Sequence, residues 1–260
     1  MSAITTIAAV IPARMAARRY PGKPLLEING LPMVEHVRRR AVLCNGFSEV
    51  VVATCDREIA DAIDSFGGKI VMTSPHHSMA TDRVAEAAKE LDCTHVVNVQ
   101  GDEILIRPQD LERMVAVIEG SPKERYWNAT APIESARELE DTAIVKCVVS
   151  ESEKILYCGR DFSHLKLKPN FEPVRKILGI LGYSRVDLFN YSQLSRTPLE
   201  TTQSIDQFRI LEHDIPMYGV RFSAGYPGIN NKREEKEVRR IIRDDPNQRK
   251  ILKLILDNEK

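Results

Sequence analysis

Apolar runs alternate with amphipathic stretches through the first half of the chain. Four runs have the near-continuous apolar character of strands that are buried on both faces of a sheet, at residues 4–11, 50–53, 70–72 and 95–99. The stretches between and after them carry apolar positions on one helical stripe, which predicts helices at residues 31–43, 59–66, 82–91 and 107–118. This alternation predicts an α/β fold with a parallel sheet wrapped by helices.

The pattern changes from residue 128 onward. Short strand-like runs occur at residues 143–149, 155–158, 177–183 and 218–222, and helical patterns at residues 186–194 and 204–212. A charged helical region follows at residues 233–256, interrupted at Pro246. We therefore predict one domain over residues 1–260, with a core at 1–127, a smaller mixed or antiparallel lobe at 128–225 and a C-terminal helical region at 226–260.

Charge and composition exclude several classes of protein. Lys plus Arg and Asp plus Glu both number 37, so the formal net charge is zero, and a general nucleic-acid or membrane surface would leave a basic excess. We find no apolar run long enough to cross a bilayer and no basic flank before the first apolar run, which argues against a signal peptide. The five cysteines are scattered, as is typical of reduced thiols in a cytoplasmic protein.

The loop after the first predicted strand concentrates positive charge. Arg14, Arg18, Arg19 and Lys23 lie within residues 12–24. Ligands of open α/β sheets bind beyond the carboxyl ends of the strands, where this loop lies. Arginine forks suit phosphate oxygens, although the spacing matches neither a Walker loop nor a dinucleotide fingerprint. The loop therefore indicates anion binding, with a merely solvated basic loop as the alternative.

A second loop brings carboxylates to the same predicted edge. Asp102 and Glu103 follow the strand at 95–99 directly, with Gly101 suited to a tight turn. Carboxylate oxygens are the ligands that Mg²⁺ prefers when it bridges substrate phosphates. A Gly-Asp pair is also a common plain turn. Because a basic loop and a carboxylate share one edge, the pair favours metal-assisted nucleotidyl transfer.

Both loops resemble those of the CMP-Kdo synthetase family, the 3-deoxy-manno-octulosonate cytidylyltransferases. Residues 11–25 read I-P-A-R-M-A-A-R-R-Y-P-G-K-P-L and residues 97–103 read V-N-V-Q-G-D-E, with a further match at the T-D-R of residues 81–83. The resemblance implies a Rossmann-like nucleotidyltransferase sheet with a smaller mixed lobe. It also implies transfer of CMP from CTP to Kdo or an analogue such as 8-amino-Kdo, with release of pyrophosphate, in lipopolysaccharide biosynthesis.

The resemblance assigns roles to individual residues. It implies that nucleotide is bound by Ala13, Arg14, Arg19, Lys23, Ala80, Thr81 and Arg83. The implied acceptor-binding residues are Gln100, Arg160, Tyr183, Asp206, Gln207 and Arg209. Catalysis would rest on Arg14, Lys23 and Asp102, with Mg²⁺ held by Asp102 and Asn230 and no protein nucleophile. By the same resemblance we expect a homodimer formed through the lobe, which would also carry the acceptor.

Three departures from the family pattern leave the identity of the acceptor undecided. Asn230 stands where the family has a second metal-binding Asp, and Ile177 and Leu181 replace a sugar-facing His and Tyr. One alternative is a cytidylyltransferase for another small acid, such as a nonulosonic acid or a phosphonate. The other alternative is a catalytically silent, nucleotide-binding regulatory relative.

Overall fold

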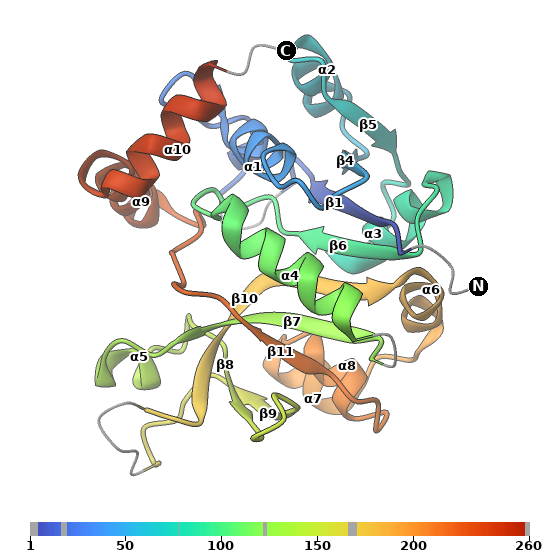
Figure 1. Ribbon diagram of the computed structural model, residues 1–260, viewed down its shortest axis with the longest axis vertical. Coiled ribbons are helices and arrows are strands. Elements are labelled where there is room, and N and C mark those ends of the chain that lie inside the picture. The colour runs from blue at the N-terminus through green and yellow to red at the C-terminus, as the bar shows by residue number, and fades with distance from the viewer. Residues whose placement is uncertain (1–4, 17–19, 78, 122–123, 166–170, 258–260) are drawn as a thin grey trace. The chain divides into compact units, whose positions relative to one another are not determined.

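The computed structural model describes residues 5–16, 20–77, 79–121, 124–165 and 171–257, which form two compact units (Figure 1). The first, which we call the core unit, combines residues 1–115 with residues 226–260. The second, the inserted unit, consists of residues 116–225 and interrupts the first in sequence.

Four parallel strands form the sheet of the core unit. Their order is β6-β1-β4-β5, and their bounds are Ile7–Ala13 for β1, Glu49–Thr54 for β4, Lys69–Met72 for β5 and His95–Val99 for β6. All seven residues of β1 are buried, as expected of a strand with neighbours on both edges and cover on both faces. The predicted parallel arrangement is confirmed, and the carboxyl ends of β1 and β6 lie next to each other.

The helices of the core unit come partly from before and partly from after the inserted unit. They are α1 (Met33–Val42), α2 (Arg57–Ser65), α3 (Ala80–Ala87), the short 3₁₀ helix η2 (Ala88–Glu90), α9 (Lys232–Asp244) and α10 (Pro246–Asp257). The helix α4 (Pro108–Gly120) runs across the boundary into the inserted unit. The C-terminal α10 packs on both α9 and α1 (Figure 1). No helix in the described ranges combines the length and apolarity needed to cross a membrane.

A β-hairpin with a two-residue turn precedes α1. Strands β2 (Glu27–Ile28) and β3 (Leu31–Pro32) pair antiparallel, and the residues between them, Asn29 and Gly30, have φ values of 50° and 89°. Asn-Gly with two positive φ angles is the preferred pair for this kind of tight turn. The helix predicted from residue 31 therefore begins only at Met33, because the two residues before it belong to β3.

The inserted unit has a mixed sheet. Its strands are β7 (Tyr126–Pro132), β8 (Lys146–Val149), β9 (Ile155–Gly159), β10 (Val174–Ser184) and β11 (Tyr218–Arg221). β7 pairs antiparallel with β10 and parallel with β11, β8 pairs antiparallel with both β10 and β9, and β10 bulges between Ile177 and Leu181. The predicted fold class, a parallel α/β sheet with a smaller mixed part, is confirmed.

The helices of the inserted unit differ from the prediction, because two short ones were not predicted and a third begins later than expected. They are α5 (Ala136–Glu140), α6 (Arg185–Gln193), α7 (Pro198–Gln203) and α8 (Gln207–Leu211). The helix predicted at residues 204–212 is wrong in its first turn, because Ser204 has a φ of 52° and ends α7. The Thr197 N–H donates to the Glu200 carboxylate at 3.3 Å at the start of α7, a helix that the helical periodicity did not predict.

Candidate active site

The loop that follows β1 is held in a compact form by backbone hydrogen bonds. The Met15 N–H donates to a carboxylate oxygen of Asp56 at 2.8 Å, and the Gly22 N–H donates to the Met15 carbonyl at 3.1 Å. Gly22 has a φ of 74°, a conformation that favours glycine. Lys23 then opens the 3₁₀ helix η1 (Lys23–Leu25), so the chain turns back and returns Lys23 to the end of the sheet.

Two glycines allow three chain segments to meet at this place. A Cβ on Gly101 would lie 2.9 Å from the Pro12 carbonyl oxygen, and a Cβ on Gly228 would lie 2.9 Å from the Asp102 carbonyl oxygen. Both distances are shorter than carbon and oxygen tolerate, so a side chain at either position would push the segments apart. The turn after β6 therefore packs directly against the end of β1 and against the segment before α9.

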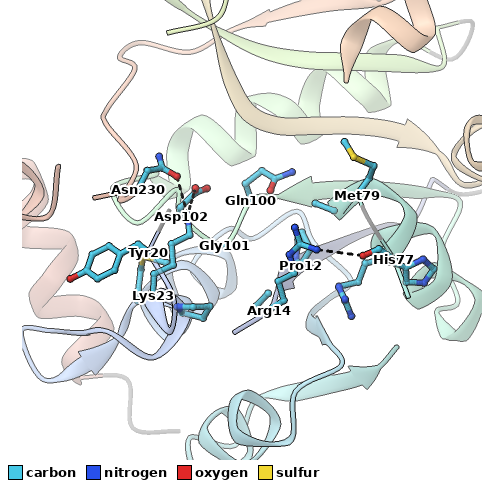
Figure 2. Close-up of a pocket in the computed structure, with 15 residues that line it drawn as sticks. Pro12, Arg14, Tyr20, Lys23, His77, Met79, Gln100, Gly101, Asp102 and Asn230 are labelled. Carbon is cyan, nitrogen blue, oxygen red and sulfur yellow. Dashed lines mark hydrogen bonds and ion pairs between the residues drawn. The ribbon is translucent and has the colours of Figure 1, made fainter. Parts of the chain in front are cut away.

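Lys23 lies at the meeting point of these segments. Its ammonium group donates to Asp102 Oδ2 at 2.7 Å, to the Ile229 carbonyl at 3.1 Å and to Asn230 Oδ1 at 3.1 Å. A lysine ammonium has three donors, and three oxygens receive them here. The side chains of Lys23 and Asp102 keep 16% and 27% of their exposure, so the ion pair lies at the wall of a cleft rather than in the core (Figure 2).

The cleft has a volume of about 310 Å³ and lies wholly within the core unit. Its walls come from the end of β1, the loop after it, α3 with the loop before it, the turn after β6 and the segment before α9 (Figure 2). The lining residues are Pro12, Ala13, Arg14, Tyr20, Lys23, Pro24, Met33, His77, Met79, Ala80, Arg83, Gln100, Gly101, Asp102 and Asn230. Three cations and one carboxylate thus share a small, partly enclosed volume.

Arg83 forms part of the cleft on the side of α3. Its side chain is 3% exposed, and its guanidinium donates to the Thr73 hydroxyl and, at 3.4 Å, to the Cys55 sulfur. Both of these partners are neutral, so neither cancels the positive charge of Arg83. A buried cation with neutral partners is suited to bind an acceptor atom of a ligand.

The loop before α3 is fixed by hydrogen bonds to Glu86. The His77 ring pairs with the Glu86 carboxylate, which also accepts the Ser74 N–H at 2.9 Å. Partial burial raises the pKa of Glu86, but these hydrogen bonds outweigh it and leave the pKa below its usual value. The carboxylate thus stays charged at neutral pH and holds His77, whose carbonyl in turn accepts Arg14 Nη1 at 3.5 Å (Figure 2).

Comparison with known proteins gives the family of this chain. A family model described as cytidylyltransferase matches residues 8–217, most of the chain. The chain belongs to the cytidylyltransferase family.

Individual relatives agree with this assignment. The chain is 40% identical over 209 residues to the 8-amino-3,8-dideoxy-manno-octulosonate cytidylyltransferase of Shewanella sediminis, covering 78% of this chain and 85% of the relative. It is 37% identical over 235 residues to the 3-deoxy-manno-octulosonate cytidylyltransferase of Escherichia coli, an alignment that covers 90% of this chain and 94% of the relative. A solved structure of CMP:2-keto-3-deoxy-manno-octonic acid synthetase complexed with CTP superposes on this chain with a TM-score of 0.85 at 35% sequence identity. The superposition covers 93% of this chain and 100% of the other. The resemblance inferred from the two loops is confirmed.

The cleft of this cytidylyltransferase gathers most of the predicted nucleotide and metal residues. Those that line it are Ala13, Arg14, Lys23, Ala80, Arg83, Asp102 and Asn230. Thr81 is 1% exposed and is not among the lining residues, although it follows Ala80 directly. Arg19 lies outside the described residues. The roles assigned to these residues stay predictions, and their shared location is what those roles require.

Predicted acceptor residues fall in both units of the cytidylyltransferase. Gln100 lines the cleft of the core unit. In the inserted unit, Arg209 is 3% exposed and pairs with Glu200 through two hydrogen bonds of 2.5 and 2.9 Å, while its guanidinium lies 4.5 Å from the centre of the Tyr191 ring. Gln207 donates to the buried Asn128 at 2.8 Å. These two side chains are therefore engaged within their own unit.

The other predicted acceptor residues also have partners in the inserted unit. Arg160 donates to the backbone carbonyls of Thr142, Gln203 and Ser204 at 2.9 to 3.2 Å. Tyr183 is 1% exposed and packs edge-on against Tyr126. Asp206 stands at the start of α8. Acceptor binding by this group stays a prediction.

Several lining residues carried no signal in the sequence analysis. Tyr20, Met33, His77 and Met79 all line the cleft. Tyr20 is the one that position in the basic loop could have suggested. The third oxygen at Lys23 is the backbone carbonyl of Ile229. Every residue has a backbone carbonyl, so the residue type at position 229 does not predict this contact.

Asp102, Asn230 and Ile229 also decide whether the site suits Mg²⁺. The described residues contain no group of three or more His, Cys, Asp or Glu side chains that could hold a metal ion. Here, however, a carboxylate, an amide carbonyl and a backbone carbonyl converge on one cation, the Lys23 ammonium. Oxygen ligands of this kind, completed by substrate phosphates and water, are typical of magnesium sites. The residues present therefore fit the metal.

Proposed function

We propose that this cytidylyltransferase transfers CMP from CTP to Kdo or its 8-amino analogue and releases pyrophosphate. The relatives that bear those two names are 37% and 40% identical to this chain, and the related structure with a TM-score of 0.85 was solved with CTP. The observation that carries the proposal is the cleft that Arg14, Lys23, Arg83 and Asp102 line together. Its cations suit a triphosphate, and its carboxylate suits a metal.

In the proposed reaction a hydroxyl oxygen of the acceptor attacks the α-phosphorus of CTP. A new phosphorus–oxygen bond forms, and the bond from the α-phosphorus to the oxygen that bridges it to the β-phosphorus breaks. Pyrophosphate leaves with that electron pair, and the hydroxyl proton passes to solvent. Lys23 and Arg14 would bind phosphate oxygens and stabilise the charge that develops on them, so positioning and electrostatics account for the catalysis without a protein nucleophile.

Mg²⁺ is the cofactor that we assign to this site. Asp102 and Asn230 would hold it, with the Ile229 carbonyl beside them. When bound, such a metal neutralises phosphate charge and orients the triphosphate. Because Asn230 brings a carbonyl oxygen without a charge, Asp102 supplies the carboxylate of the set.

The enzyme would act in the cytoplasm as a homodimer. Support for the dimer comes from β9 in the inserted unit, which in the described part of the chain pairs with β8 alone. Leu156 and Tyr157 on this edge strand are 56% and 50% exposed. The Ile155 N–H at the start of β9 donates to the Met217 carbonyl, but no other strand lines this edge in the described residues, and exposed apolar side chains on such an edge are typical of a surface that another chain covers.

Pyrophosphate release from CTP tests the proposal. We would assay the purified protein with Mg²⁺ and with Kdo, 8-amino-Kdo, a nonulosonic acid and a phosphonate in parallel, and expect release with Kdo or its 8-amino analogue. Turnover of only one of the other acids would contradict the proposed acceptor. CTP-dependent thermal stabilisation without any turnover would identify the chain as a silent nucleotide-binding relative.

Asp102→Asn is the decisive variant in this assay. We expect the rate to fall by about 10²- to 10³-fold, the range seen when a preorganised electrostatic group is removed from an active site. The far-UV circular dichroism should not change, because Asp102 lies at the cleft wall. Asp245→Asn is the matched control, since Asp245 accepts a hydrogen bond from Tyr226 and does not line the cleft.

A further inference from the structure

The three oxygens around the Lys23 ammonium are held in place by their own neighbours. The Asn230 N–H donates to the Glu234 carboxylate at 2.6 Å, and the Asn231 side chain caps α9 by accepting the N–H groups of Arg233 and Glu234. Gly228 allows the close approach of this segment to the Asp102 backbone. The oxygens thus form a preformed cation site whose geometry does not depend on Lys23 alone.

The groups in direct contact with the Lys23 ammonium carry a single negative charge. One of the three oxygens belongs to a carboxylate, and the other two belong to neutral carbonyls. A single lysine charge balances a single carboxylate charge. A divalent ion would leave an excess positive charge beside the ammonium of Lys23, and like charges at contact distance repel strongly away from bulk water.

We infer that Lys23 is an internal counter-ion that occupies the cation position until CTP arrives, so that metal and nucleotide enter the site together. This inference rests on the proposed function, because it concerns the site of the proposed metal. The triphosphate supplies the negative charge that the residues lack, and it offers oxygens to the Lys23 ammonium. Lys23 then leaves Asp102 and Asn230 for the phosphates, and their oxygens become available to the divalent ion.

Metal and nucleotide binding are therefore linked through one side chain. Linkage is reciprocal, so CTP should tighten metal binding by the same factor by which metal tightens CTP binding. Lys23 contributes to this factor in two ways. CTP draws the Lys23 ammonium away from the three oxygens, and the metal competes with the ammonium for the same oxygens. Without Lys23 the oxygens are vacant from the start, and the metal should bind even without nucleotide.

Binding of Mn²⁺, followed by its electron paramagnetic resonance signal, tests the inference without any acceptor or turnover. With Mn²⁺ alone we expect Lys23→Met to bind at least about tenfold more tightly than the wild type, because a positive charge has left the site. CTP should tighten binding strongly in the wild type and much less in Lys23→Met. Arg14→Met is the matched control, since it removes a cation of the same cleft that donates to the His77 carbonyl, and it should leave the affinity for Mn²⁺ alone near the wild-type value.

The outcomes separate the two proposals. Equal affinity of wild type and Lys23→Met for Mn²⁺, or an equal increase in Arg14→Met, would overturn the counter-ion role while leaving the proposed function intact. A protein that binds no Mn²⁺ with or without CTP would instead refute the metal assignment of the proposed function.

A measurement on the wild type covers the case in which Lys23→Met does not fold. Nuclear magnetic resonance of protein carrying ¹³C- and ¹⁵N-labelled lysine reports each ammonium group, and Lys23→Arg assigns the signal of Lys23. We expect this signal to shift on addition of Mg²⁺ with CTP and to stay unchanged with the same concentration of Mg²⁺ alone. A signal that does not respond to Mg²⁺ with CTP would overturn the inference.

Discussion

Single residues of α1 show how much polarity this core unit buries. His36 is fully buried, and its Nε2 donates to the Ile28 carbonyl at 2.5 Å, while its Nδ1 has no hydrogen-bond partner among the described residues. A neutral imidazole suits this environment, because its second nitrogen then carries no proton to donate. Burial lowers the pKa of His36 to about 4, and the nearby Arg40 and Arg39 charges act in the same direction.

The depressed pKa of His36 predicts a pH-dependent stability. The unfolded chain protonates His36 near pH 6.5, whereas the folded chain does so only near pH 4. The contribution of neutral His36 to the free energy of unfolding is therefore complete above pH 6.5 and is lost as the pH falls to 4. We expect this residue to remove about 3 kcal/mol of unfolding free energy across that interval. His36→Gln, which can still donate to Ile28, should flatten the dependence measured by urea unfolding at several pH values.

A control is available at a surface histidine. His164 is exposed, so His164→Gln should leave the pH dependence of unfolding as it is in the wild type. Identical pH profiles for His36→Gln and the wild type would show that His36 does not titrate as the structure implies.

At the scale of residues, charged side chains could be predicted from the sequence and backbone groups could not. Arg14, Lys23 and Asp102 stood out because their charges follow predicted strands, and all three line the cleft. The carbonyl of Ile229, by contrast, depends on how the segment before α9 folds back on the turn after β6. That contact joins positions more than a hundred residues apart, and no local pattern encodes it.

At the scale of elements, α9 is tied to the loop after β1. The Tyr20 hydroxyl donates to a Glu235 oxygen at 2.8 Å, and the other oxygen of Glu235 accepts Arg239 Nε at 2.9 Å. Arg239 also donates to the Glu27 carbonyl at 2.8 Å. Figure 2 shows the Tyr20 hydroxyl directed away from Lys23 and Asp102, while its ring lines the cleft. The helix thus fixes the loop from outside the cleft.

This tie predicts a selective effect on nucleotide binding. Tyr20→Phe keeps the ring and removes the hydrogen bond to a carboxylate, an interaction worth at most about 1.5 kcal/mol at a partly exposed site. We expect the KM for CTP to rise several-fold with little change in the melting temperature, since Tyr20 is only partly buried. Tyr226→Phe removes a similar bond to Asp245 outside the cleft and should leave the KM unchanged.

Combining substitutions tests the interaction itself. If the hydrogen bond acts as described, Tyr20→Phe with Glu235→Gln should raise the KM no more than the stronger of the two single changes. Fully additive effects on the KM would mean that the two residues act independently.

Apolar elements were predictable, and elements built on buried polar residues were not. The four parallel strands of the core unit show near-continuous apolar runs, and all four were predicted, whereas the short β2 and β3 were not. In β7, the buried Asn128 and Thr130 interrupt the apolar pattern. Asn128 is satisfied by the carbonyls of Ala129 and Leu178 and by the Gln207 side chain, all of which the fold supplies. Such a strand is recognisable only once its partners are in place.

At the scale of the whole molecule, the proposed homodimer makes a direct prediction. Tyr157→Glu places a charge on the exposed edge strand β9, where burial of an unpaired charge would be costly. We expect sedimentation equilibrium to show a weaker dimer or a monomer. Leu254→Glu is the control, because Leu254 is 46% exposed on α10 of the core unit and belongs to a different surface. A wild type that sediments as a monomer would contradict the proposed assembly.

The chain order of the core unit has a consequence for synthesis. A nascent chain that ends at residue 225 already contains β1, the basic loop and Asp102, but it lacks Ile229 and Asn230. The ribosome therefore delivers two of the three oxygens around Lys23 only after the whole of the inserted unit has been made. Any premature stop within residues 116–225 would yield a protein that has Asp102 and Lys23 but lacks the other two oxygens that the Lys23 ammonium contacts.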